Sequence, residues 1–250
     1  MTLIRLTAVS KSFASDGGSH CVFSGINLEI GRGEAVSLVG PNGIGKSTLA
    51  GIVAGIDPGY GGEIWRSPEI GPQSPVLFQD YRASLLPWLS ISDNITYPLA
   101  VRGMPRDARD EIRDALLARA PARLDLKTAT HRLSGGQAQL VCILRTLSVS
   151  PKLIVCDEPF SAIDYQARIL LREELSRICC ERGIAMLFIS HSMEDAVLVA
   201  DRVIVLTGQP ATITADIAID APRPRQAAWL DGEAAIQARR RLREAITPRL

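Results

Sequence analysis

The chain has 250 residues, of which 46 % are hydrophobic and 22 % are charged. This length and composition predict a folded protein of one or two domains and exclude a disordered or fibrous chain. The 28 basic and 27 acidic side chains leave a net charge of +1, so the charge gives no support to a nucleic-acid partner.

The N-terminal part of the chain alternates short apolar segments with glycine-rich breaks, which is typical of strands and tight turns. We expect strands at residues 3–6, 22–30, 35–39, 63–65 and 76–78. After the third strand, a glycine loop from Gly40 leads into a helical pattern over residues 46–56, which Pro58 and Gly59 end.

The pattern becomes helical from residue 84 to 131. Ser92 and Asp93 resemble helix caps before an apolar turn, and residues 106–120 alternate charged and apolar side chains at helical spacing. Strands and helices then alternate again, with strands expected at 153–156, 185–189 and 203–206 and helices at 165–182 and 193–200. Short apolar strands between helices predict an α/β fold with a buried, mostly parallel sheet.

The end of the chain reads as a linker, the APRPR segment at 221–225, followed by a helix over 231–250. One face of this helix is apolar and carries Ala235, Ala238, Leu242, Ala245 and Ile246. Packing on the body is the simplest expectation, and contact with anionic lipid headgroups or a partner subunit is the alternative. We therefore expect one domain over 1–220, with a helical subdomain at about 84–150, and a C-terminal extension at 221–250.

The glycine loop matches the phosphate-binding pattern G-x-x-x-x-G-K-[ST]. It consists of Gly40, Pro41, Asn42, Gly43, Ile44, Gly45, Lys46, Ser47 and Thr48. Glycines let backbone N–H groups point inward, and the positive end of the following helix adds to this cradle. Lys46 can then reach the β- and γ-phosphates, and the Ser47 hydroxyl can bind Mg²⁺. A plain glycine-rich turn is the alternative, but the strand and helix expected on either side favour the phosphate loop.

Two carboxylates, Asp157 and Glu158, follow the apolar strand at 153–156. At the carboxyl end of a parallel strand, both can face the ligand crevice of the sheet. Asp157 can hold a Mg²⁺-bound water, and Glu158 can orient or deprotonate an attacking water. A solvated strand end is the alternative, and the phosphate loop favours the catalytic interpretation.

The segment Leu133 to Gln137 reads LSGGQ. In order and spacing with the phosphate loop, the acidic pair and His191, it resembles the ABC-type ATPases over about residues 2–206. The resemblance implies a P-loop core sheet, an antiparallel β subdomain and an inserted α-helical subdomain that carries LSGGQ. It also implies a head-to-tail dimer around two ATP molecules, in which the γ-phosphate held by one subunit is bound by the other subunit's Ser134, Gly135, Gly136 and Gln137.

The resemblance assigns four further residues. Gln79 resembles the glutamine that contacts Mg²⁺ and the attacking water and senses the membrane partner, and a surface role is its alternative. His191 resembles the histidine that contacts the γ-phosphate and supports Glu158, with a purely structural histidine as its alternative. Asp164 resembles the aspartate that faces the other subunit, and Phe13 is the candidate for stacking on adenine, with core packing as its alternative.

The residues after Gln137 depart from the family pattern, because basic residues are usual there at alternate positions and residues 138–142 read AQLVC, with Arg145 as the first basic residue. The serine and glycines that face the phosphate are intact. We therefore expect activity to persist with changed electrostatics at the dimer interface.

Residues 85–95 (LLPWLSISDNI) and 223–225 (RPR) resemble the nitrate/sulfonate/taurine branch of bacterial importers. This resemblance implies a peripheral ATPase on the cytoplasmic face of the inner membrane that uses ATP and Mg²⁺. Its implied partners are a transmembrane permease, an extracytoplasmic solute-binding protein and a second, most simply identical, ATPase subunit. The implied cargo is a small anion such as a sulfonate, taurine or nitrate.

Other features of the sequence agree with this location. The five cysteines have no metal-type spacing and predict free thiols in a reducing compartment. Because no apolar run is long enough to cross a bilayer, and no signal-peptide core is present, we expect a chain that neither spans a membrane nor is exported. Two other functions stay open: a soluble ABC ATPase in DNA repair or translation, and a regulator that binds ATP without hydrolysing it.

Overall fold

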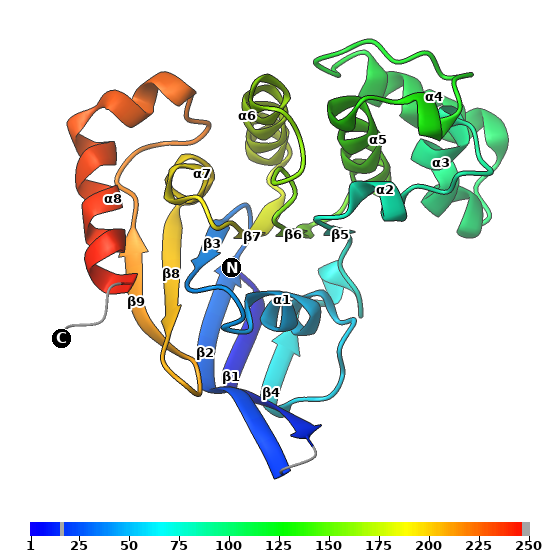
Figure 1. The fold of residues 1–250 in the computed structure, drawn as a ribbon. Helices are drawn as coiled ribbons and strands as arrows, with labels where there is room; N and C mark the ends of the chain where they lie inside the picture. Colours follow the sequence, from blue (N-terminus) through cyan, green and yellow to red (C-terminus); the bar gives the residue numbers. More distant parts are fainter. Residues whose placement is uncertain (16–17, 247–250) are drawn as a thin grey trace.

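The computed structural model describes residues 1–15 and 18–246, and Figure 1 shows two β-sheets with most helices above them and one at their left. The smaller sheet is antiparallel, with the strand order β2-β1-β4. Its strands are β1 (Thr2–Ser15), β2 (Gly18–Gly31) and β4 (Gly61–Arg66). Leu6 of β1 pairs with Leu28 and with Ile64, and this end of the sheet is buried. β1 is much longer than the expected strand at 3–6, because its second half is stabilised by pairing with β2 and not by burial alone.

The larger sheet has six strands in the order β5-β6-β7-β3-β8-β9. Its strands are β3 (Ala35–Val39), β5 (Val76–Leu77), β6 (Leu153–Asp157), β7 (Ala185–Ile189), β8 (Arg202–Thr207) and β9 (Thr212–Ala218). All neighbours are parallel except β9, which runs antiparallel to β8. The expected α/β fold with a mostly parallel core sheet and an antiparallel β portion is confirmed.

Two hydrophobic clusters cover the two faces of this sheet. Along β6, Ile154 and Cys156 belong to the cluster that the helices α5 (Gly135–Ser148) and α6 (Tyr165–Arg182) help to form. Val155 points to the opposite face, into a cluster shared with α1 (Lys46–Ala54) and the small sheet. This alternation is the reason why the central strands are mostly apolar on both faces. All five cysteines are free.

The middle of the chain forms a group of helices on one side of the sheets (Figure 1). They are α2 (Tyr81–Ser84), α3 (Ile91–Val101), α4 (Arg106–Leu117) and α5. The expected cap at Ser92 and Asp93 is wrong. Ser90 caps α3 by accepting the backbone N–H of Asp93 at 3.0 Å, so Ser92 and Asp93 lie inside the helix. Ser90 Oγ also donates to Oδ2 of Asp93 at 2.6 Å, so the two side chains fix the start of the helix at Ser90.

The C-terminal part packs on the body, as the simplest expectation had it. Helix α8 (Glu233–Ile246) contacts α7 (Met193–Val199), β8 and β9, and buries Ala235, Ala238 and Leu242. The end of the expected helix, residues 247–250, lies outside the described residues. Between β9 and α8 runs a strap, residues 219–231, whose last part contacts α7. Among the described helices, none has the length and apolarity that a membrane span requires.

Arg225 fastens this strap to α7. Its guanidinium donates hydrogen bonds to the carbonyl oxygens of Val197 and Ala200, at 2.8 and 2.7 Å, and to that of Ile219 at 3.3 Å. The carbonyl groups at the end of a helix have no partner within the helix, so the strap supplies one. Arg225 also lies over the ring of Trp229, 5.1 Å from its centre.

Candidate nucleotide-binding site

The phosphate loop connects the end of β3 to the start of α1, and its course depends on glycine. Gly45, the residue before α1, has φ = 100°, and a Cβ there would lie 2.5 Å from Cγ1 of Val22. A Cβ on Gly40 would lie 2.4 Å from the carbonyl oxygen of Leu206. The backbone therefore turns tightly against β2 and β8, and it opens at the N-terminus of α1, where unpaired N–H groups can bind an anion.

Lys46 and Ser47 point from the start of α1 to different sides of this loop. Lys46 Nζ donates hydrogen bonds to the carbonyl oxygens of Gly40 and Pro41, both at 2.9 Å. Burial lowers the pKa of the Lys46 ammonium, and the negative charges of Glu158 and Asp157 oppose this shift. Ser47 Oγ donates to Oδ1 of Asp157 at 3.1 Å. Burial raises the pKa of the Asp157 carboxyl, and the hydrogen bond from Ser47 opposes this shift.

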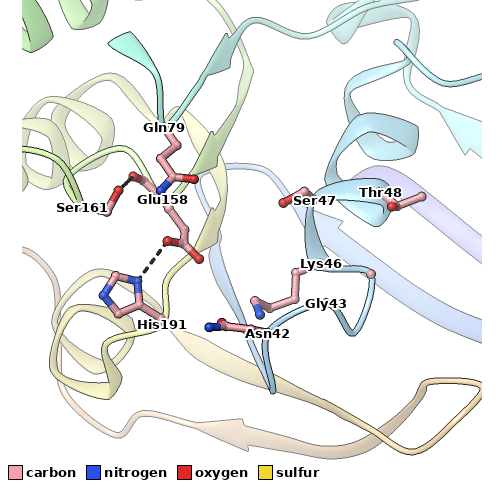
Figure 2. Close-up of a pocket in the computed structure, with 10 residues that line it drawn as sticks. Asn42, Gly43, Lys46, Ser47, Thr48, Gln79, Glu158, Ser161 and His191 are labelled. Atoms are coloured by element: carbon pink, nitrogen blue, oxygen red, sulfur yellow. Dashed lines mark hydrogen bonds and ion pairs between the residues drawn. The ribbon is translucent and has the colours of Figure 1, made fainter.

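Glu158 is held opposite the loop by its backbone and by His191 (Figure 2). It follows β6 with φ = 47°, a conformation that costs a non-glycine residue about 1 kcal/mol or more. Its backbone N–H donates to the carbonyl oxygen of Ile189 at 3.1 Å. His191 Nδ1 lies 2.9 Å from Glu158 Oε2, and because an ionised carboxylate only accepts, Nδ1 carries the proton. This arrangement aims a carboxylate oxygen toward the loop.

An open pocket of about 560 Å³ separates Glu158 from the loop. Its lining unites residues from four segments: Asn42, Gly43, Gly45, Lys46, Ser47, Thr48, Gln79, Glu158, Ser161 and His191. All of these except Ser161 were expected from the sequence. Ser161 Oγ donates to the carbonyl oxygen of Glu158 at 3.0 Å. Its signal in the sequence is the segment 161–164 (SAID), which contributes to the resemblance to the ABC-type ATPases and ends at Asp164.

The LSGGQ residues do not line this pocket. Ser134 caps α5 in the helical group, where its Oγ accepts the backbone N–H of Gln137 at 3.2 Å. The Ser134 N–H donates in return to Gln137 Oε1 at 3.0 Å. A Cβ on Gly135 would lie 2.8 Å from the Tyr81 hydroxyl, and one on Gly136 would lie 2.8 Å from Cβ of Ala167. The glycines thus let α2 and α6 approach the N-terminus of α5.

Asp164 and Phe13 also lie outside the pocket. Asp164 caps α6 by accepting the backbone N–H of Ala167 at 2.9 Å. Phe13 is 46 % exposed on β1, so its alternative, core packing, is wrong. The Lys11 ammonium lies 4.8 Å from the centre of its ring. On the other side of the loop lies a second hollow of about 360 Å³, whose lining includes His20, Cys21, Val22, Pro41 and Ile44.

This geometry can bind a phosphate chain and hold a carboxylate opposite it. A model of the ABC transporter family matches residues 23–161, more than half of the chain. The chain belongs to this family.

Several members of the ABC transporter family resemble the chain along most of its length. It is 40 % identical over 227 residues to the "Aliphatic sulfonates import ATP-binding protein SsuB 1" of Xanthomonas axonopodis pv. citri, covering 89 % of this chain and 88 % of that protein. The "Nitrate transport protein NasD" of Klebsiella oxytoca is 36 % identical, with 89 % and 87 % covered. The "Nitrate import ATP-binding protein NrtC" of Synechocystis sp. is 39 % identical over 90 % of this chain. The chain spans only about a third of the length of NrtC, 34 %.

Solved ABC cassettes share the fold. The structure of cbiO1 from Clostridium perfringens, described as part of the ABC transporter complex cbiONQ, matches with a TM-score of 0.76 at 23 % identity and covers 97 % of this chain and 96 % of that one. A dimeric structure of the cassette MJ0796 bound to ADP and Pi matches with a TM-score of 0.75 at 24 % identity, covering 88 % and 100 %.

Proposed function

We propose that this chain is the ATP-hydrolysing peripheral subunit of a bacterial importer for a small anion. The observation that carries the proposal is the pair of Glu158 and His191 held across one pocket from a complete phosphate loop. A carboxylate fixed opposite bound phosphates is what hydrolysis of the terminal phosphate requires.

Each residue of the pocket has a chemical task in this proposal. The backbone N–H groups of the loop and Lys46 bind the phosphates of ATP. Glu158 orients the attacking water and accepts its proton, while the hydrogen bond from His191 keeps the carboxylate aimed at the water. Gln79 lines the same pocket and contacts this water. His191 also faces the γ-phosphate, and Phe13 stacks on adenine.

Mg²⁺ fits the pair of Ser47 and Asp157. A hydroxyl and a carboxylate oxygen meet there at 3.1 Å, and hard oxygen ligands are those that Mg²⁺ prefers. Burial raises the pKa of Asp157, so a cation would stabilise its charged form. Among the described residues, no group of three His, Cys, Asp or Glu side chains could hold a metal alone. Ser47, Asp157 and Gln79 would hold the ion, which would supply positive charge beside the phosphates.

The second half of each site comes from another subunit in this proposal. Ser134, Gly135, Gly136 and Gln137 lie away from the chain's own pocket, at an exposed helix N-terminus suited to a phosphate. A head-to-tail dimer would bring them to the γ-phosphate held by the other subunit, with Asp164 at the same interface. Closure then depends on ATP, and hydrolysis releases it.

The import role rests on the relatives, whose names describe import of sulfonates and transport or import of nitrate. We therefore place the chain on the cytoplasmic face of the inner membrane, bound to a permease that a solute-binding protein supplies with a sulfonate, taurine or nitrate. Residues 1–220 form the ATPase domain with its helical subdomain at about 84–150, and residues 221–250 form the extension.

Replacing the proposed base tests the ATPase. We expect Glu158→Gln to lower kcat of ATP hydrolysis by about 100-fold or more, which is the range that a positioned base contributes. Phosphate release under multiple turnover measures this loss, and sedimentation velocity with ATP should show a longer-lived dimer. Glu63→Gln, on an exposed position of β4, is the control. Turnover of Glu158→Gln at the wild-type rate would remove Glu158 from this role.

A further inference from the structure

The side chain of His191 has few contacts that would fix its orientation. The imidazole is 49 % exposed, and among the described residues its one side-chain hydrogen bond is the bond to Glu158. The direction of this bond therefore depends on how firmly the backbone from Ser190 to Ser192 is fixed.

A buried ion cluster lies next to this backbone, formed by Arg168 and Arg172 of α6 and Asp195 of α7. Asp195 stands four residues after His191 and is 3 % exposed. Arg172 Nη1 donates to Asp195 Oδ1 at 2.7 Å, and Arg168 Nε donates to Oδ2 at 3.1 Å. Two other nitrogens of Arg172, Nε and Nη2, have no hydrogen-bond partner among the described residues. The charge of Arg172 is thus balanced by Asp195.

Ser190 joins the ion cluster to both sides of His191. Its Oγ donates a long hydrogen bond of 3.5 Å to Asp195 Oδ2 and accepts the backbone N–H of Ser192 at 3.0 Å. Ser192 Oγ in turn accepts the backbone N–H of Asp195 at 3.2 Å. The residues before and after His191 are therefore held in one closed set of hydrogen bonds that ends on the buried carboxylate.

The ion cluster also reaches the start of α6. Arg168 lies in the first turn of this helix, and its backbone N–H donates to the carbonyl oxygen of Asp164 at 2.9 Å. In the fold, α6 and α7 contact each other directly, so the ion cluster connects the two loops that precede these helices.

We propose that Asp195 is a positioning residue for His191, and through His191 for Glu158. Its carboxylate binds Arg168 and Arg172, and these ion pairs hold the first turn of α7 against α6. The backbone at His191, which precedes this turn, is fixed as a result. A neutral side chain at position 195 leaves the buried guanidinium of Arg172 and the half-buried one of Arg168 without their shared counter-ion, and their repulsion shifts this turn. The proposal rests on the proposed ATPase function, because it concerns how the Glu158–His191 pair is aimed.

A double-mutant cycle tests the proposal. Single-turnover ATP hydrolysis is measured for the wild type, Asp195→Asn, His191→Ala and the double variant, together with the Kd of ATP. We expect Asp195→Asn to slow hydrolysis about tenfold while Kd changes less than twofold, since the phosphate loop is untouched. In the His191→Ala background, Asp195→Asn should cause no further loss. Equal losses in both backgrounds would overturn the proposal, because Asp195 would then act without His191.

Three further variants keep the result decisive. Asp195→Glu keeps the charge and should recover most of the rate. Ser190→Ala removes the link without removing a charge, so it decides the question if Asp195→Asn does not fold; a wild-type rate for Ser190→Ala would then overturn the proposal. Glu174→Gln is the matched control, since it breaks an α6 ion pair with Arg177 on the same helix and should leave the rate unchanged.

Failure of the proposed function gives a different result. A wild-type chain that hydrolyses no ATP overturns the ATPase itself. A His191→Ala variant at the wild-type rate overturns the role of His191, and with it the positioning role. A slow His191→Ala variant with additive Asp195 losses overturns the positioning role alone.

Discussion

Individual glycines of the phosphate loop differ in how much space surrounds them. Gly45 combines φ = 100° with a Cβ position 2.5 Å from Val22, whereas Gly43 has φ = 76° and open space around its Cβ position. Substitution at Gly43 meets backbone strain alone, while substitution at Gly45 meets strain and a clash with β2. Comparing substitutions at the two positions therefore distinguishes the cost of backbone strain from the cost of a steric clash.

We expect Gly43→Ala to lower the free energy of unfolding by about 1 kcal/mol, the cost of a left-handed conformation, and Gly45→Ala by about 3 kcal/mol because β2 must also move. Urea unfolding of the nucleotide-free protein, followed by circular dichroism, measures both. Equal losses for the two variants would contradict the close packing of Gly45 on Val22.

Among the elements, the α7 helix is held at both ends by residues of other segments. The strap residue Arg225 caps its C-terminal end, and the ion cluster holds its first turn. Burial lowers the pKa of Arg225 to about 10, so the guanidinium is still charged at neutral pH and its bonds to the carbonyl groups are strong.

Arg225→Met should lower the free energy of unfolding by about 3 kcal/mol, because it keeps an apolar stem but leaves several buried carbonyl groups without a donor. Arg241→Met, on the exposed side of α8, is the control and should change it by less than about 0.5 kcal/mol. Thermal and urea unfolding would reveal both effects. A loss for Arg225→Met no greater than that of the control would show that the strap does not cap α7.

The bounds of some elements could be predicted well, and the reasons are local. Helix α6 starts after its cap Asp164 and ends before Gly183, and both signals can be read along the chain. Strand β9 was not predicted. It alternates exposed and half-buried residues, and it is stabilised by pairing with β8, which the sequence does not reveal.

The pocket residues also differ in whether a local sequence signal identifies them. The loop residues are adjacent in the sequence, so one pattern identifies them together. Ser161 begins the segment that ends at Asp164, but the sequence does not place it in the pocket, because its position depends on the turn after Glu158. The cap by Arg225 and the ion cluster join distant segments, and no local signal marks them.

In the whole molecule, the two proposed nucleotide-binding surfaces of one subunit are separate. The pocket with Glu158 lies on the sheets, and the N-terminus of α5 with Ser134 lies in the helical group, where it takes no part in that pocket. Under the proposed function, each surface is completed by a second copy.

Ser134→Asp tests this arrangement without removing the cap of α5, since aspartate is also a good N-cap residue. We expect ATP binding to persist, while hydrolysis falls at least tenfold because the new carboxylate repels the γ-phosphate across the dimer. In the Glu158→Gln background, the same change should abolish the ATP-dependent dimer in sedimentation velocity. Ser150→Asp, just beyond the other end of α5, serves as the control. An intact dimer in Ser134→Asp would disprove the head-to-tail contact.

The strand order of the larger sheet affects how the chain is made. Ser37 of β3 lies between Phe188 and Val203, so both neighbours of this strand leave the ribosome long after it. The small sheet can assemble early, whereas the mostly apolar β3 stays unpaired until about three quarters of the chain, through β7, has been synthesised. A nascent chain stalled before β7 would therefore expose β3 as an unpaired, aggregation-prone strand and would depend on chaperones to stay soluble.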